Sequence, residues 1–239
     1  MTAASEAPEV TLSRIRHLDL AFEPWDWPFA RERQAEIAAH FARVQETRAV
    51  WNGRVLLLRH PRQEDDVFRA TYFEVDYASF LAWIHWGCPD REVFNGFGMG
   101  VLRGSDGAFL LGEMASHTAT AGRIYFPAGT PDRNDLRGGH VDMAHSVARE
   151  VEEEVGLVPS DYRAADDWTC VRTEQWIAFM RQLDVDVPAA ELQARITGWL
   201  SVQDTPELSA IHLVRDSGDF RPAMPRFITA FLAAQLAQA

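Results

Sequence analysis

The residues of this chain most suited to chemistry are three glutamates, Glu150, Glu153 and Glu154, on a helix predicted over residues 142–155. Because an α-helix has about 3.6 residues per turn, the three carboxylates project from neighbouring points on one side. They repel one another, and they lie near the negative C-terminal end of the helix dipole. Hard divalent cations such as Mg2+ take oxygen ligands, bind diphosphates and would relieve this repulsion. The spacing therefore indicates a metal site; the alternative is a solvated acidic helix face.

The residues that flank the glutamates make the pattern more specific. Residues 149–157 read Arg-Glu-Val-Glu-Glu-Glu-Val-Gly-Leu, which matches every fixed position in the second half of the Nudix box. Residues 125–129, Tyr-Phe-Pro-Ala-Gly, resemble the Phe-Pro-Gly-Gly turn common in that family. The chain thus resembles Nudix hydrolases over residues 93–239. The resemblance implies an α/β/α sandwich with a mixed sheet, and metal-dependent hydrolysis of a phosphoanhydride bond in a nucleoside-diphosphate-linked compound.

The resemblance also implies a role for each residue of this segment. Glu150 and Glu154, one helical turn apart, are expected to bind Mg2+ or Mn2+ most directly, together with a backbone carbonyl near Gly129. Glu153 is expected to bind a second ion or a bridging water, which makes it both a metal ligand and a catalytic residue. Arg149 is expected to pair with a carboxylate and orient it for catalysis. The metal would neutralise the diphosphate and lower the pKa of the attacking water.

Residues outside this segment are candidates for a general base and for substrate binding. Nudix hydrolases often take a further base from a later loop, and Glu207 is the candidate favoured here, with Glu174 as the other. His140 follows a glycine pair that could form an anion-binding turn. Trp176 is a candidate platform for a nucleobase, as is Trp168. For each of these residues the alternative is an ordinary surface or packing role.

The first half of the Nudix box departs from the family pattern. The family places a Glu eight residues before the Arg and a Gly six residues before that Glu, whereas this chain has Val141 and Asp135 there. We infer an insertion near residues 130–137. The missing Glu normally orients the Arg, and Asp142 is a candidate to replace it; the alternative is that Asp142 simply caps the helix.

The predicted elements that position these residues combine helices and strands, which indicates a layered α/β or α+β fold. Apolar periodicity predicts helices over residues 28–47, 77–86, 142–155, 191–200 and 225–236. Short apolar runs predict strands over residues 54–59, 68–75, 98–103, 109–113, 123–126, 168–183 and 211–214. The polar stretch 127–139 predicts a loop. We expect Asp76 to cap the second helix and Gly156 to end the third.

Two parts are expected: an N-terminal α+β extension over residues 1–92 and a Nudix-like hydrolase domain over residues 93–239. In the segments 51–53 and 76–81 the extension resembles the extra region of Nudix proteins that act on UDP-sugars, which favours a nucleotide sugar as substrate. Two alternatives to an enzyme remain open from the sequence. One is a non-catalytic Nudix-fold sensor of a nucleotide or another ligand, and the other is an interaction scaffold with an acidic helix.

The composition limits the classes of partner that this protein is expected to bind. The formal net charge is −12, so we expect no duplex nucleic acid as partner, and a small phosphorylated nucleotide instead. Residues 1–10 lack the features of a signal peptide, and no apolar run approaches the ~20 residues of a membrane span, so we expect a cytoplasmic protein without membrane contact. Cys88 and Cys170 are expected to be buried, reduced thiols. No pattern indicates an oligomeric state.

Overall fold

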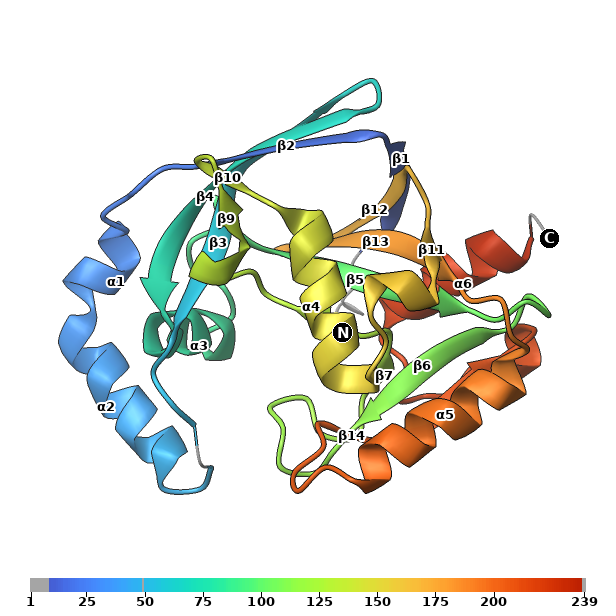
Figure 1. Cartoon of the computed structure of the whole chain (residues 1–239). Helices are drawn as coiled ribbons and strands as arrows, with labels where there is room; N and C mark the ends of the chain where they lie inside the picture. The colour runs from blue at the N-terminus through green and yellow to red at the C-terminus, as the bar shows by residue number, and fades with distance from the viewer. Residues whose placement is uncertain (1–8, 49, 238–239) are drawn as a thin grey trace, which may run out of the picture.

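The computed structural model describes residues 9–48 and 50–237 (Figure 1). Its helices are α1 (Pro28–Glu32), α2 (Gln34–Gln45), α3 (Tyr77–His85), α4 (Met143–Val155), α5 (Ala189–Ser201) and α6 (Arg226–Leu236). Its strands are β1 (Thr11–Ile15), β2 (His17–Phe22), β3 (Arg54–Glu64), β4 (Val67–Asp76), β5 (Val93–Arg103), β6 (Phe109–Met114), β7 (Ile124–Tyr125), β8 (Ala128–Gly129), β9 (Leu136–Arg137), β10 (His140–Val141), β11 (Arg163–Ala164), β12 (Trp168–Thr173), β13 (Trp176–Asp184) and β14 (Leu208–Val214). Short 3-10 turns cover Arg133–Asp135, Pro159–Asp161 and Ser217–Asp219.

The strands form a mixed sheet. Its main path runs β1-β12-β13-β5-β3-β4-β2-β10-β9, while β6 and β8 pair with β5, β7 and β14 pair with β6, and β11 pairs with β13. The β13–β5 and β2–β4 pairs are parallel, whereas neighbours such as β12–β13 and β3–β4 are antiparallel. The prediction of an α+β fold built on a mixed sheet is confirmed.

Helices cover both faces of the central strands. The apolar sides of α4 and α5 pack on one face, and α6 packs on the other. On the α4 side, β5 carries Gly98 and Gly100. A Cβ atom at these glycines would lie 2.5 Å from a methyl of Val147 and 2.4 Å from a methyl of Val151, respectively. The two glycines therefore let α4 approach the sheet closely, which fixes the position of its acidic edge.

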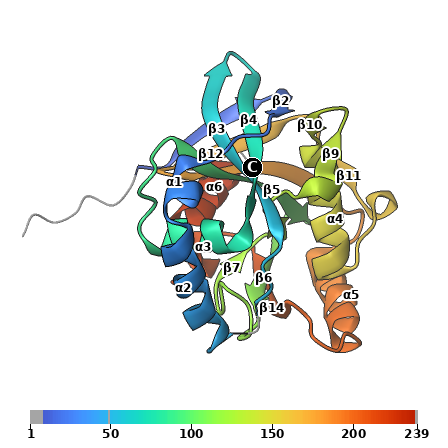
Figure 2. The same ribbon diagram turned by 90° about the vertical axis from the view of Figure 1, so that its left-hand side faces the viewer.

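The N-terminal helices pack beside β3 and β4. Helix α3 begins after Asp76, whose carboxylate accepts a hydrogen bond from the Ser79 N–H at 2.9 Å, as the sequence predicts. Trp27, Phe73 and Trp83 form the centre of this part of the core. Helix α2 lies against α3, with α4 and α5 on the other side of the view (Figure 2). Strands of this region join the common sheet through the β1–β12 and β3–β5 pairs, and the expected division at residues 92 and 93 stays a prediction.

Several segments differ from the elements expected from the sequence. The helix predicted over residues 28–47 is two helices, because Arg33 leaves helical geometry at φ −110° and ψ 18°. The strand predicted over residues 168–183 is a hairpin of β12 and β13, with Glu174 in its turn at a φ of 29°. Strands β1 and β2 are not predicted. The two apolar residues of β1, Leu12 and Ile15, do not follow the alternation of a strand, and β1 pairs with a distant segment. No helix within residues 9–48 and 50–237 is long and apolar enough to cross a membrane.

Candidate active site

Helix α4 carries the predicted carboxylates at the edge of its buried face. Asp142 begins the helix by accepting a hydrogen bond from the His145 N–H at 3.0 Å, and Gly156 ends it in the left-handed conformation at a φ of 68°. Met143 and Val151 anchor the helix in the core. The last turn of α4 contains no basic residue. The acidic side chains there consequently face the negative end of the helix dipole without a compensating charge on the helix end itself.

Glu154 and Glu150 are carboxylates whose ionised forms are poorly stabilised. Glu154 is 4% exposed, and its Oε2 atom is buried without a hydrogen-bond partner. Burial and the neighbouring charge of Glu150 hold the pKa of Glu154 well above its ordinary value. Burial also raises the pKa of Glu150 to about 7, although the charge of Arg149 opposes the rise. Two adjacent carboxylates with raised pKa values, one buried and one 14% exposed, are a site that a cation would stabilise.

Gly129 lies directly against Glu150. A Cβ atom at this position would be 1.9 Å from Oε1 of Glu150, closer than any side chain could approach. Strand β8 brings the glycine there, because Gly129 pairs with Gly98 of β5, and Gly98 lies against Val147 of α4. The backbone at 128–129 is thus brought beside the carboxylates, as expected for a carbonyl ligand. That a carbonyl in this turn binds a metal stays a prediction.

Arg149 holds two of the carboxylates from the same helix. Its Nη1 atom lies 2.9 Å from Oε1 of Glu150 and 3.1 Å from Oε2 of Glu153. Glu153 has 59% of its side chain exposed, so its surroundings differ from those of the buried pair. The structure therefore brings Arg149 together with Glu150 and Glu153, and it leaves Glu153 turned toward Arg149 and solvent.

Asp135, a buried residue in the predicted insertion near residues 130–137, orients Arg149. Asp135 is 0% exposed, and it accepts a hydrogen bond from Nη2 of Arg149 at 3.1 Å. The Asp132 N–H also donates to it, at 3.1 Å. Burial acts to raise the pKa of Asp135, but the hydrogen bonds from Arg149 and Asp132 outweigh it, and the pKa is lowered. Asp142 caps α4 instead, so the suggestion that Asp142 replaces the missing glutamate is wrong.

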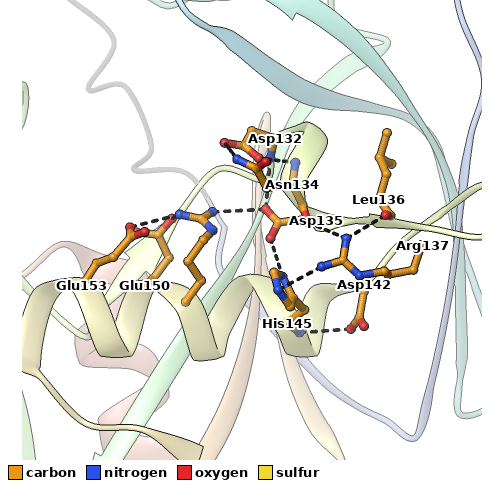
Figure 3. Close-up of polar contacts among 10 residues, drawn as sticks. Asp132, Asn134, Asp135, Leu136, Arg137, Asp142, His145, Glu150 and Glu153 are labelled. Carbon is orange, nitrogen blue, oxygen red and sulfur yellow. Dashed lines mark hydrogen bonds and ion pairs between the residues drawn. The ribbon is translucent and has the colours of Figure 1, made fainter.

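His145 extends this network toward the loop (Figure 3). Its Nδ1 atom lies 3.0 Å from Oδ1 of Asp135, and its Nε2 atom lies 3.0 Å from Nη2 of Arg137. Because an arginine can only donate, Nε2 accepts, and Nδ1 carries the proton that is donated to Asp135. Arg137 also donates to the carbonyl of Asn134 at 2.6 Å. The expected 127–139 loop is therefore an ordered segment, with β8, a 3-10 turn and β9, that is fastened to α4 by charged hydrogen bonds.

The two candidate bases lie in different places. Glu207 is exposed, and its carbonyl accepts a hydrogen bond from the Ala115 N–H at 2.8 Å. After burial, its charge is among the causes that raise the pKa of Glu150 and of Glu154, so it shares their electrostatic neighbourhood. Glu174 lies in the β12–β13 turn, where its charge acts on Cys88. The structure thus associates Glu207 with the buried pair.

The two candidate substrate-binding residues have partners of their own. His140 lies in β10, and its Nε2 atom is 3.5 Å from Oδ1 of Asp19. The Trp176 ring packs against Trp83, with ring centroids 6.4 Å apart. These contacts do not bring either residue to the buried carboxylates, and their substrate-binding roles stay predictions. Cys88 and Cys170 are buried, free thiols.

The carboxylates fit a divalent cation only in part. Within residues 9–48 and 50–237, no three His, Cys, Asp or Glu side chains are arranged to hold a metal ion. The unpartnered Oε2 of Glu154, with Glu150 beside it, nevertheless supplies a buried oxygen that a bound cation would satisfy. Glu150 and Glu154 therefore fit the predicted ligands, whereas Glu153 would have to leave Arg149 to join them.

Comparisons with known proteins give remote similarities. No protein-family model matches the chain, and no curated protein matches it. A Nudix hydrolase from M. smegmatis, RenU, is 17% identical over 61% of this chain and 88% of its own, with a TM-score of 0.39. A MutT protein from Methanosarcina mazei is 18% identical over 61% of this chain and 94% of its own, with a TM-score of 0.40. Similarities at this level do not by themselves assign a function.

Proposed function

We propose that this chain is a Nudix-type pyrophosphohydrolase that uses Mg2+ or Mn2+ and hydrolyses a nucleoside-diphosphate-linked compound, with a nucleotide sugar favoured. The observation that carries the proposal is the carboxylate of Glu154 on α4, which is 4% exposed and keeps an unpartnered oxygen, together with that of Glu150 one turn away, which is 14% exposed. Burying two adjacent carboxylates without a cation is unfavourable, so the arrangement calls for a functional reason. The match of residues 149–157 to the second half of the Nudix box supplies that reason.

Each residue has a defined task in this proposal. Glu150 and Glu154 hold the cation, with the backbone at Gly129 as a further ligand and Glu153 available for a second ion. Bound Mg2+ or Mn2+ neutralises the diphosphate and lowers the pKa of the attacking water. Arg149 keeps Glu150 in place through the 2.9 Å contact. Glu207 accepts a proton from the attacking water, since it is exposed and near the buried pair.

Asp135 supports the proposal because it restores an interaction that the sequence lacks at the usual position. Its carboxylate is fully buried and bonded to Arg149. A fixed carboxylate keeps the guanidinium aligned toward Glu150 and Glu153. Asp135 is thus a positioning residue, which acts through Arg149 and not on the substrate.

A ligand sensor that binds without turnover is the second candidate function. The observation that favours it is that Glu153, one of the three α4 glutamates proposed as metal ligands, is 59% exposed and bound to Arg149, whereas Glu154 is buried. A sensor needs the ligand pocket and the cation but no activated water. Binding and turnover measured on one protein sample therefore separate the two functions.

The test is a substrate panel followed by phosphorus NMR. The protein is incubated with Mg2+ or Mn2+ and with nucleotide sugars, dinucleotides, dinucleoside polyphosphates, capped RNA and nucleoside triphosphates. We expect turnover of a nucleotide sugar by the wild type and loss of that turnover in Glu154→Gln. Glu152→Gln is the matched control, because Glu152 is an exposed residue of the same helix. No turnover, or equal rates for the wild type and Glu154→Gln, would overturn the proposal, and tight binding without turnover would favour the sensor.

A further inference from the structure

Trp51 is a large apolar side chain that does not pack into the hydrophobic core. It is 83% exposed, more than the other exposed large apolar residues, Val202 at 77%, Trp199 at 42% and Val158 at 37%. Its ring rests over Gly53, where a Cβ atom would lie 2.8 Å from the indole. An indole held open to solvent in this way gains little from hydrophobic burial, so its position calls for another explanation.

The segment that carries Trp51 is fixed to the fold. The Gly53 carbonyl accepts a hydrogen bond from the Tyr77 N–H at 2.9 Å, and the Asn52 side-chain oxygen accepts one from the Ala78 N–H at 2.8 Å. Both donors belong to the first turn of α3. The indole is thus presented from a rigid support, as a stacking surface requires, because little side-chain freedom is then lost on binding.

Trp51 forms one wall of a hollow that is also lined by Glu207, the candidate general base. The hollow has a volume of about 330 Å³. Its lining combines residues before and after the predicted boundary at 92: Trp51, Val55 and Tyr77 come before it, and His117, Thr118 and Glu207 come after it. If Glu207 acts as the general base, the reacting phosphate would lie at the side of the hollow that Glu207 lines. Its volume is at the lower end of the range for small-molecule sites.

The β6–β7 loop joins this hollow to the carboxylates. Thr120 bonds through its Oγ1 to the hydroxyl of Tyr125, at 2.6 Å, and the Ala115 N–H bonds to the Glu207 carbonyl. Burial raises the pKa of Tyr125 to about 12, and among the further causes are the charges of Glu154 and Glu207. Tyr125 is therefore bonded to the β6–β7 loop and shares an electrostatic neighbourhood with Glu154 and Glu207.

We propose that this hollow binds the nucleobase of the substrate, stacked on the indole of Trp51, so that the N-terminal region determines which nucleotide is accepted. The inference rests on the proposed function for its choice of ligand. The walls match a planar heteroaromatic ring, because Trp51 and Tyr77 offer aromatic surface while His117 and Thr118 offer hydrogen-bonding groups. A base at the Trp51 end places the attached phosphates toward Glu207.

The test measures binding without catalysis. Uridine and adenosine 5′-monophosphates are titrated into the full chain in the Glu154→Gln background, with calorimetry and tryptophan fluorescence as readouts. We expect Trp51→Ala to weaken the tighter nucleotide roughly 5- to 100-fold, as for loss of one base–aromatic stack. Trp51→Phe should keep most of the affinity, and Val202→Ala, the matched exposed control, all of it. Glucose 1-phosphate, which has no base, should bind equally to Trp51→Ala and its parent.

The outcomes separate this inference from the proposed function. No detectable binding of either nucleotide at millimolar concentration, or equal affinities for Trp51→Ala and Val202→Ala, would overturn the inference even if the wild type hydrolyses a nucleotide sugar. Trp51-dependent binding by a wild type that hydrolyses nothing would keep the inference and overturn the enzyme. Where turnover is present, Trp51→Ala should raise KM and leave kcat almost unchanged, because the base lies away from the reacting bond.

Discussion

Replacing Glu150 with glutamine is predicted to stabilise the metal-free protein at alkaline pH. Burial raises the pKa of Glu150 from an ordinary value of 4.5 to about 7. The folded state therefore binds this proton more tightly than the unfolded state, and stability falls as the pH rises from about 4.5 through 7. Glutamine has the same shape but no charge, so Glu150→Gln removes this pH dependence.

The size of the effect follows from the pKa. The difference between 4.5 and about 7 corresponds to about 3 kcal/mol, at ~1.4 kcal/mol for each tenfold change in proton affinity. The variant also loses the ion pair with Arg149, and the carboxylate is 14% exposed to screening solvent. We therefore expect Glu150→Gln to gain about 1–2 kcal/mol in free energy of unfolding at pH 8, and close to nothing at pH 5.

The assay is urea denaturation with a chelator present, at pH 5 and at pH 8, for the wild type, Glu150→Gln and the control Glu152→Gln. Added Mg2+ or Mn2+ should restore stability to the wild type at pH 8 and do much less for Glu150→Gln. A metal ion stabilises the folded state in proportion to how tightly it binds there, and the variant lacks one of the proposed carboxylate ligands. Equal differences between Glu150→Gln and the wild type at the two pH values would refute the reasoning.

Three further predictions concern the loop that faces α4. Asp135→Ala should lower the free energy of unfolding by about 3–5 kcal/mol in urea denaturation, because it removes the buried carboxylate that bonds Arg149, His145 and the Asp132 N–H; a cost below about 1 kcal/mol would contradict this. Asp142→Ala should cost about 1 kcal/mol in the same assay, as for loss of a helix cap, and leave kcat almost unchanged. Gly129→Ala should abolish hydrolysis, because its Cβ would collide with Glu150, whereas Gly198→Ala, in open space on α5, should retain the wild-type rate.

Local signals explain why α4 was predictable in detail. Its cap, its apolar spacing and its terminal glycine are encoded within the helix and the residues next to it. The same holds for the cap of α3 by Asp76. The α+β class and the position of the acidic edge were predictable from such signals, because each depends on neighbours in the chain.

The contacts that the sequence did not indicate are those between distant segments. Asp135 occupies a position where the family pattern has glycine, and its bond to Arg149 depends on how the enlarged loop folds back on α4. Strand β1 pairs with β12 across most of the chain. The contact of Trp176, a candidate base platform, with Trp83 also joins segments far apart in the chain. Trp51, whose exposure only the fold reveals, is the indole beside Glu207.

Binding of Mn2+ to the carboxylates of α4 tests the central claim most directly. Free Mn2+ is measured by electron paramagnetic resonance during titration of the wild type, Glu154→Gln and Glu152→Gln at pH 8. The account predicts binding to the wild type and to Glu152→Gln, and affinity reduced at least about tenfold in Glu154→Gln, since the variant loses the buried oxygen that lacks a partner. No binding to the wild type, or the same affinity in Glu154→Gln as in Glu152→Gln, would contradict it.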